Sequence, residues 1–128
     1  MITFFLDRTF GAQRVVRVLR DAGWTVEVHQ DHFRQDIPDQ EWIPVVAERQ
    51  WVVLTQDKNI RHRPLEREAV RSSGLRLFAF TQNNLPSSET SAILLRALPQ
   101  VALIAEGQQP PFIGQIQRTG AVRIIDNF

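Results

Sequence analysis

Residues 51–58 read WVVLTQDK, an apolar run that ends in a carboxylate, Asp57. A short, continuous apolar run is typical of a parallel strand that is covered on both faces. A carboxylate after such a strand faces the crevice at the carboxyl ends of the strands, where open α/β sheets bind ligands. The stretch therefore predicts an α/β fold with a functional site at Asp57.

Strand-like and helical patterns alternate on both sides of this stretch. The expected strands are residues 2–6, 24–29, 51–55 and 75–80, and the expected helices are 10–22, 39–49, 64–73 and 88–97 (capped by Ser87 or Ser88), with a shorter helix after Pro99 to residue 107. Residues 112–117 and 121–125 are typical of a β-hairpin.

Parallel strands need crossovers of about a dozen residues, and the alternation supplies them. It predicts a three-layer α/β/α sandwich with a mostly parallel sheet of about four to five strands and a C-terminal β-hairpin. The expected organisation is one domain over residues 1–128, with an α/β core at 1–106 and the hairpin at 110–126.

The composition restricts the class of protein. A chain of 128 residues with 43% hydrophobic residues suits one ordinary globular domain. The chain has no cysteine, which excludes disulfides and thiolate metal sites. Its apolar start ends at Asp7, too early for a signal peptide or a membrane span, so we expect a soluble, cytoplasmic protein without a membrane partner. The net charge of +1 leaves any attraction to nucleic acid to local clusters of charge.

Three aspartates are the candidate catalytic and metal-binding residues: Asp7 after strand 2–6, Asp39 at the start of helix 39–49, and Asp57. Two unit charges about 4 Å apart interact by about 4 kcal/mol at an effective dielectric constant of about 20, so three converging carboxylates favour a divalent cation between them. Each aspartate also has a structural interpretation. Asp7 or Asp39 can cap a helix, and Asp57 can stabilise a turn.

Three segments combine into a recognisable pattern: Asp7 at a strand end, PDQEWI at residues 38–43, and LTQDKNIR at residues 54–61. The pattern resembles PIN or PIN-like domains, in particular the compact branch related to VapC-type toxins. Residues 54–61 are its most specific part, and the resemblance extends from residue 5 to about residue 98. The resemblance implies a divalent-metal ribonuclease, often a toxin that an antitoxin holds inactive.

The same resemblance implies Mg2+ or Mn2+ as the cofactor, RNA as the substrate, a cognate antitoxin as a protein partner, and a homodimer. It assigns Asp7, Asp39 and Asp57 to the metal and places Thr9 beside it. The family usually adds a glutamate from a helix before the second aspartate, and that region is shortened here to residues 24–37. Glu41 is then the candidate fourth carboxylate, and the number of metal ions stays open.

Basic residues lie close to Asp57 in the sequence and are candidates for binding the substrate phosphates, together with Thr9. They are Lys58, Arg61, Arg63, Arg67 and Arg71. The last three recur every four residues, so they share one face of the expected helix. The alternative interpretation is a solvated helix face, because Glu66 and Glu68 are interspersed among these cations.

Two other functions fit parts of the pattern. A receiver domain of a two-component system has a similar length and an aspartate after its third strand. It also needs an acidic pair after the first strand and a lysine after the fifth, whereas Arg8 follows Asp7 and no lysine follows Lys58. The other alternative is a catalytically degenerate PIN-like domain that only binds a partner, with the apolar hairpin 112–125 as its interaction surface.

Overall fold

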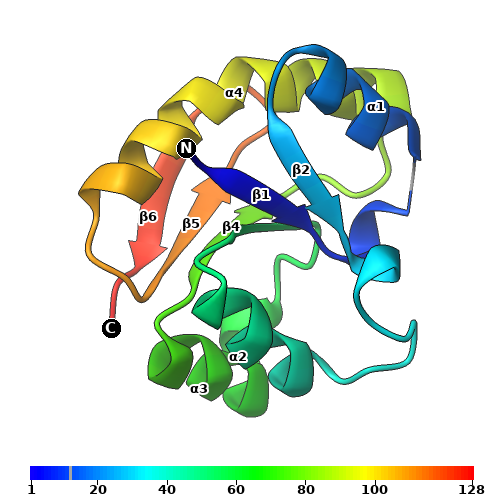
Figure 1. Cartoon of the computed structure of the whole chain (residues 1–128). Coiled ribbons are helices and arrows are strands. Elements are labelled where there is room, and N and C mark those ends of the chain that lie inside the picture. Colours follow the sequence, from blue (N-terminus) through cyan, green and yellow to red (C-terminus); the bar gives the residue numbers. More distant parts are fainter. Residues whose placement is uncertain (12) are drawn as a thin grey trace.

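The computed structural model describes residues 1–11 and 13–128 and contains one six-stranded sheet (Figure 1). The strand order is β2-β1-β3-β4-β5-β6, with β1 to β5 parallel and β6 antiparallel to β5. The strands are β1 (Thr3–Leu6), β2 (Thr25–Val28), β3 (Val52–Thr55), β4 (Arg76–Phe80), β5 (Phe112–Ile116) and β6 (Val122–Asp126). The predicted, mostly parallel sheet is confirmed.

Helices cover both faces of this sheet. They are α1 (Gln13–Asp21), α2 (Asp39–Glu48), α3 (Pro64–Ser73) and α4 (Ser87–Gly107), with short 3-10 helices η1 (Arg8–Phe10), η2 (His29–Asp31) and η3 (Ile60–His62). Figure 1 shows α1 and α4 on one side of the sheet and α2 and α3 on the other. The predicted three-layer α/β/α sandwich is therefore confirmed.

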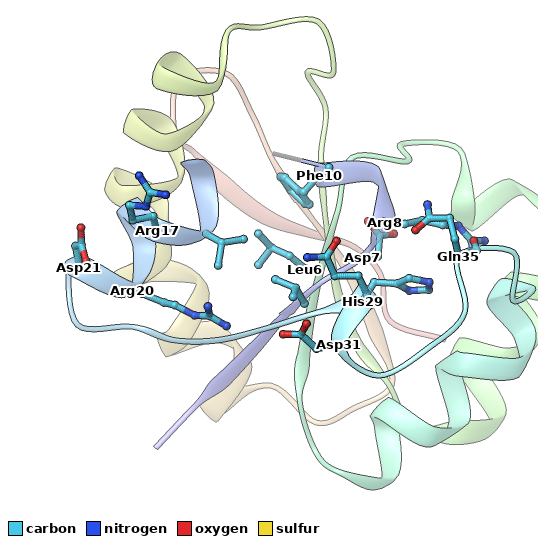
Figure 2. A pocket seen from close by; sticks show the side chains of 14 residues that line it. Leu6, Asp7, Arg8, Phe10, Arg17, Arg20, Asp21, His29, Asp31 and Gln35 are labelled. Carbon is cyan, nitrogen blue, oxygen red and sulfur yellow. The ribbon is translucent and has the colours of Figure 1, made fainter. Parts of the chain in front are cut away.

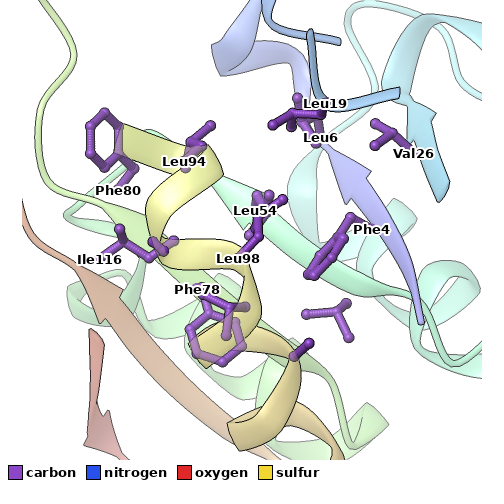
Figure 3. Close-up of a cluster of buried hydrophobic side chains, with 14 of the residues drawn as sticks. Phe4, Leu6, Leu19, Val26, Leu54, Phe78, Phe80, Leu94, Leu98 and Ile116 are labelled. Carbon is purple, nitrogen blue, oxygen red and sulfur yellow. The ribbon is translucent and has the colours of Figure 1, made fainter. Parts of the chain in front are cut away.

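Strands β1, β3, β4 and β5 are mostly apolar because each sends side chains into two separate cores. In β1, Phe4 and Leu6 join the core under α1 and α4, which Figure 3 shows, while Phe5 joins the core under α2 and α3. In β3, Leu54 joins the core under α1 and α4, and Val53 joins the core under α2 and α3. Burial on both faces explains why these four strands show no regular alternation with polar residues, whereas β2, which contributes only Val26 to a core, alternates.

The fourth helix differs from the sequence prediction. Pro99 was expected to interrupt it, but α4 runs unbroken over 21 residues with Pro99 inside. An interior proline costs about 3 kcal/mol. Leu98 and Val101, beside the proline, are fully buried against the sheet, and this packing outweighs the local preference. The expected serine cap is also wrong, because Pro86 holds the N-cap position without a side-chain hydrogen bond.

The N-terminal helix is shorter than predicted. Phe10 belongs to η1, and Gly11 separates η1 from the following residues with a φ of 29°. Residue 12, which the prediction placed inside the helix, lies outside the described residues. No helix in the part of the chain that the structure describes combines the length and the apolar character needed to cross a membrane.

The C-terminal hairpin is confirmed, and it extends the main sheet. Its first strand, β5, pairs in parallel with β4, and β6 forms the outer edge. Gly114 of β5 lies against Phe78 of β4, so closely that a Cβ atom at this position would stand 2.5 Å from the Phe78 ring. The hairpin therefore packs on the central sheet only because residue 114 has no side chain.

We expect Gly114→Ala to lower the free energy of unfolding by about 1–3 kcal/mol, the usual cost of an extra methyl group in a packed core. Phe78 is 0% exposed, so its ring has no free space into which to move. Urea denaturation measures this loss. Gly107→Ala is the matched control, because nothing lies within 4 Å of a Cβ atom there. An unchanged stability of Gly114→Ala would contradict this packing.

Candidate active site

Asp7, Asp39 and Asp57 line one cleft of about 400 Å³ at the carboxyl ends of the strands. Asp7 follows β1 and Asp57 lies two residues beyond β3, and these two strands are hydrogen-bonded neighbours. Asp39 is the first residue of α2, which packs under the same edge. The three aspartates that were singled out from the sequence thus come together in space.

Asp7 is the most buried of the three, with 5% of its surface exposed. Its Oδ1 atom accepts hydrogen bonds from the backbone N–H of Thr9 at 3.0 Å and from the Thr9 hydroxyl. Burial raises the pKa of Asp7 from 3.8 to about 6, although hydrogen bonds from Thr55 and Thr9 oppose the shift. The capping interpretation also holds, because Asp7 caps η1. A cation beside this carboxylate would favour its ionised form.

Thr9 connects the two strand ends. Its hydroxyl donates to Asp7 and accepts a hydrogen bond from the backbone N–H of Gln56, at 2.8 Å, in the loop after β3. In the same loop, the hydroxyl of Thr55 accepts from the backbone N–H of Asp57 at 3.0 Å. These two hydroxyls hold Asp7 and Asp57 in a fixed relation, and Thr9 lines the cleft as predicted.

Asp39 has two side-chain partners. Its Oδ1 atom accepts from the indole N–H of Trp42 at 2.9 Å and from Nη2 of Arg8 at 2.8 Å. Arg8 is held in turn by the backbone carbonyl oxygens of Gln35 and Ile37. Pro38 occupies the N-cap position of α2, so the interpretation of Asp39 as the helix cap is wrong.

Asp57 occupies a turn and pairs with an arginine. Its Oδ1 atom accepts from the backbone N–H of Asn59 at 3.1 Å, which is the turn interaction considered above. Its Oδ2 atom accepts a hydrogen bond from Nη1 of Arg63, and this hydrogen bond raises the pKa of the Arg63 guanidinium. The Arg63 side chain remains 47% exposed, against 19% for Asp57. Arg63 therefore covers the carboxylate from the solvent side.

The fourth carboxylate of the cleft is Glu66, which was considered from the sequence only as part of the alternative interpretation of α3 as a solvated helix face. Glu41 is exposed and does not line the cleft. Glu66 follows Arg63 by three residues, a spacing that puts both on one side of a helix. This spacing was the sequence signal that links Glu66 to Arg63. Because basic and acidic residues are mixed in this segment, the signal was not distinctive.

The other predicted substrate-binding cations have different positions. Arg67 donates to Asp126 of β6 at 2.8 Å, and its guanidinium lies over the ring of Phe128. Arg71 pairs with Glu68 on the same helix. Lys58 is exposed and Arg61 is half-buried on η3, and neither lines the cleft. Each arginine of the four-residue repeat thus pairs with a different carboxylate, and of the three only Arg63 lines the cleft.

The chemistry of the cleft suits a hard divalent cation. Its four carboxylates are oxygen ligands of the kind that magnesium and manganese prefer. With every group ionised, Arg8 and Arg63 offset only part of this charge and leave a net charge of −2. Within residues 1–11 and 13–128, no three His, Asp or Glu side chains are already placed to hold one metal ion. Guanidinium groups pair with Asp39 and Asp57 in this structure.

Comparison with known families decides the assignment. A family model described as "PIN like domain" matches residues 2–82, which include all four carboxylates of the cleft. The chain belongs to this PIN-like family. The predicted PIN-like domain is thereby confirmed. A receiver domain has the strand order 2-1-3-4-5, which is also the order of the first five strands of this sheet. The family match, and not the topology, therefore separates a PIN-like domain from a receiver domain.

A curated relative extends the likeness beyond the matched segment. The PIN-like chain is 31% identical over 125 residues to "Putative ribonuclease VapC45" of Mycobacterium tuberculosis strain H37Rv. The alignment covers 94% of this chain and 90% of the relative, so it also includes much of α4 and the hairpin. No solved structure matches the chain.

Proposed function

We propose that this chain is a divalent-metal-dependent endoribonuclease, and the toxin of a toxin–antitoxin pair. The observation that carries the proposal is the meeting of Asp7, Asp39, Asp57 and Glu66 at one cleft of a PIN-like domain. The name of its relative, a VapC ribonuclease, supports RNA as the substrate and an antitoxin as the partner. The reaction is hydrolysis of a phosphodiester bond.

Asp7 and Asp57 would hold the metal ion directly or through water, and Asp39 and Glu66 would hold its outer waters. A bound Mg2+ or Mn2+ supplies an activated water molecule and stabilises the charge that develops on the phosphate. The chain needs no nucleophile of its own for this reaction. Thr9 fixes Asp7 against the loop that carries Asp57, which keeps the two carboxylates in place.

The two arginines of the cleft have different roles in this proposal. Arg8 is held by two backbone carbonyls in addition to Asp39, so it positions the Asp39 carboxylate. Arg63 contacts Asp57 from the solvent side and is half-exposed. It can exchange the carboxylate for a phosphate group, which a guanidinium binds through two parallel hydrogen bonds. Arg63 therefore binds the substrate backbone once a cation occupies the site.

We expect Arg63→Gln to raise the affinity for Mn2+ about two- to fivefold, because the metal no longer competes with an exposed ion pair. The same substitution weakens RNA binding. Calorimetric titration with Mn2+ and a filter-binding assay with RNA measure the two effects. Arg71→Gln is the control, since Arg71 pairs with Glu68 outside the cleft. A lower metal affinity in Arg63→Gln would contradict this role.

One observation favours the partner-binding alternative. Guanidinium groups hold two of the four carboxylates, an arrangement that a degenerate, non-catalytic cleft would also adopt. Incubation of purified protein with a pool of labelled RNA separates the two functions. Cleavage that requires Mg2+ or Mn2+ and stops in chelator supports the nuclease. Intact RNA in both metals, together with no measurable metal binding, supports the degenerate domain.

A further inference from the structure

A second, larger cavity of about 600 Å³ adjoins the cleft (Figure 2). Asp7 and Arg8 line both, so the two spaces meet at these residues. Figure 2 shows Arg17, Arg20 and Asp21 of α1 at one end of the view, and Asp7 and Arg8 toward the other. The cavity lies between α1, the end of β2 and η2. The chemistry proposed above leaves it without a role.

The walls of this cavity combine apolar and polar groups. Its apolar side chains are Leu6, Phe10, Val16 and Val28. Gln30 and Gln35 add exposed amide groups, each of which can donate and accept hydrogen bonds. A nucleobase has apolar faces and a polar edge, and proteins read single-stranded RNA by contacting both. The volume is within the range of about 300–1,000 Å³ that small-ligand sites occupy.

Arg17 is the cation of the cavity that is available for a ligand. It forms no ion pair with the residues that the structure describes, and it is exposed. Arg20, one turn further along α1, instead donates to the backbone carbonyl of Val26 at 2.6 Å. Arg14 is also exposed on α1 but does not line the cavity. The helix therefore offers both a test residue and a matched control.

We propose that this cavity binds one base of the RNA and so selects the sequence that is cut. The inference rests on the proposed function, which supplies RNA as the ligand. The shared residues Asp7 and Arg8 place the base next to the phosphate in the cleft. Gln30 and Gln35 read the edge of the base, and Arg17 binds the adjoining ribose phosphate. The residues that set the base preference then lie on α1, on η2 and in the loop after η2, apart from the carboxylates that support hydrolysis.

Equilibrium binding in chelator tests this inference without any cleavage. The probes are the four nucleoside 5′-monophosphates, ribose 5-phosphate and inorganic phosphate, titrated into the full chain and followed by NMR. We expect one nucleotide to bind roughly tenfold more tightly than ribose 5-phosphate, as one or two hydrogen bonds to a base edge provide. Arg17→Gln and Gln30→Ala weaken this binding, whereas Arg14→Gln leaves it unchanged. Val16→Trp, which fills the cavity, abolishes it.

Circular dichroism of each variant verifies that it is folded, and the surface variants Arg17→Gln and Gln30→Ala decide the question if Val16→Trp unfolds. Equal binding of all four nucleotides and ribose 5-phosphate overturns the inference, as does binding that Arg17→Gln and Arg14→Gln affect equally. If the parent cleaves RNA but shows no cavity-dependent binding, this inference alone fails. If cavity-dependent binding occurs without metal-dependent cleavage, the proposed nuclease fails, and only the binding of a base by the cavity stands.

Discussion

Asp57→Asn is expected to lower metal-dependent RNA cleavage by about a hundredfold or more, because the metal loses a charged ligand in a site whose ion stabilises the transition state by several kcal/mol. An asparagine retains the size of Asp57 and an oxygen that can accept the turn hydrogen bond from Asn59. The substitution thus removes the charge and preserves the loop. Initial rates of cleavage of a labelled RNA, at several Mn2+ concentrations, measure the loss.

Asp126→Asn is a closely matched control for this experiment. Asp126 and Asp57 are both 19% exposed, and each pairs with a half-exposed arginine at or near the start of α3. Asp126, however, lies at the end of β6 and does not line the cleft. Asp126→Asn should cleave at the rate of the parent. If both variants lose cleavage activity to the same extent, the loss is due to lower stability. If Asp57→Asn cleaves RNA at the rate of the parent, Asp57 is not part of the active site.

Asp7→Asn is expected to make the metal-free protein more stable at pH 8. The pKa of Asp7 is raised to about 6 in the folded protein by burial, so the folded state binds a proton that the unfolded state releases. The stability that this proton provides is complete below the unfolded pKa of 3.8 and is lost as the pH rises through about 6. A shift of this size corresponds to roughly 3 kcal/mol.

An asparagine at position 7 carries no charge and still accepts the hydrogen bond from the backbone of Thr9. The variant should therefore keep its stability between pH 5 and pH 8, where the parent loses roughly half of this amount, about 1.4 kcal/mol, because the other half is already lost between pH 3.8 and pH 5. Urea unfolding in chelator at the two pH values measures this difference. Added Mn2+ should reverse the order at pH 8, because a metal that binds only the folded parent stabilises it.

Asp36→Asn controls for the chemical change itself, since the Asp36 side chain is 85% exposed. This variant should follow the parent at both pH values. A gap between parent and Asp7→Asn that is as large at pH 5 as at pH 8 would contradict the burial of a charged carboxylate as its cause.

The fold was predictable because its central strands, β1, β3, β4 and β5, are covered on both faces. A fully buried strand such as β3 must be apolar along its whole length, and its end is marked by the first polar residues, so Asp57 was visible from local sequence. Asp7 was visible for the same reason. Pro99 shows the limit of this reasoning. Its effect depends on how firmly α4 packs on the sheet, a contact between residues that are distant in the chain.

The three aspartates of the site were predictable from the sequence, whereas the residues that join or contact them in the structure were less so. Glu66 reaches the cleft only because α3 packs beside α2, and its spacing from Arg63 places the two on one helix side without indicating which way that side faces. The pairing of Arg67 with Asp126 joins residues 59 positions apart. The anchoring of Arg8 by Gln35 and Ile37 likewise depends on the path of a loop. Such contacts arise from the tertiary structure and leave no local signature.

The division of the interior into two cores has a practical consequence for protein engineering. Asp39 and Glu66 stand on helices that pack in the smaller core, around Trp42 and Val70. Repacking that core would displace carboxylates together with their helices. Among the described residues, the core beneath α4 supports the carboxylate cleft only through the strand ends and through Phe10 of η1. Thermostabilising mutations are therefore best sought along α4, where the stability of the fold can be raised without displacing the carboxylates of the cleft.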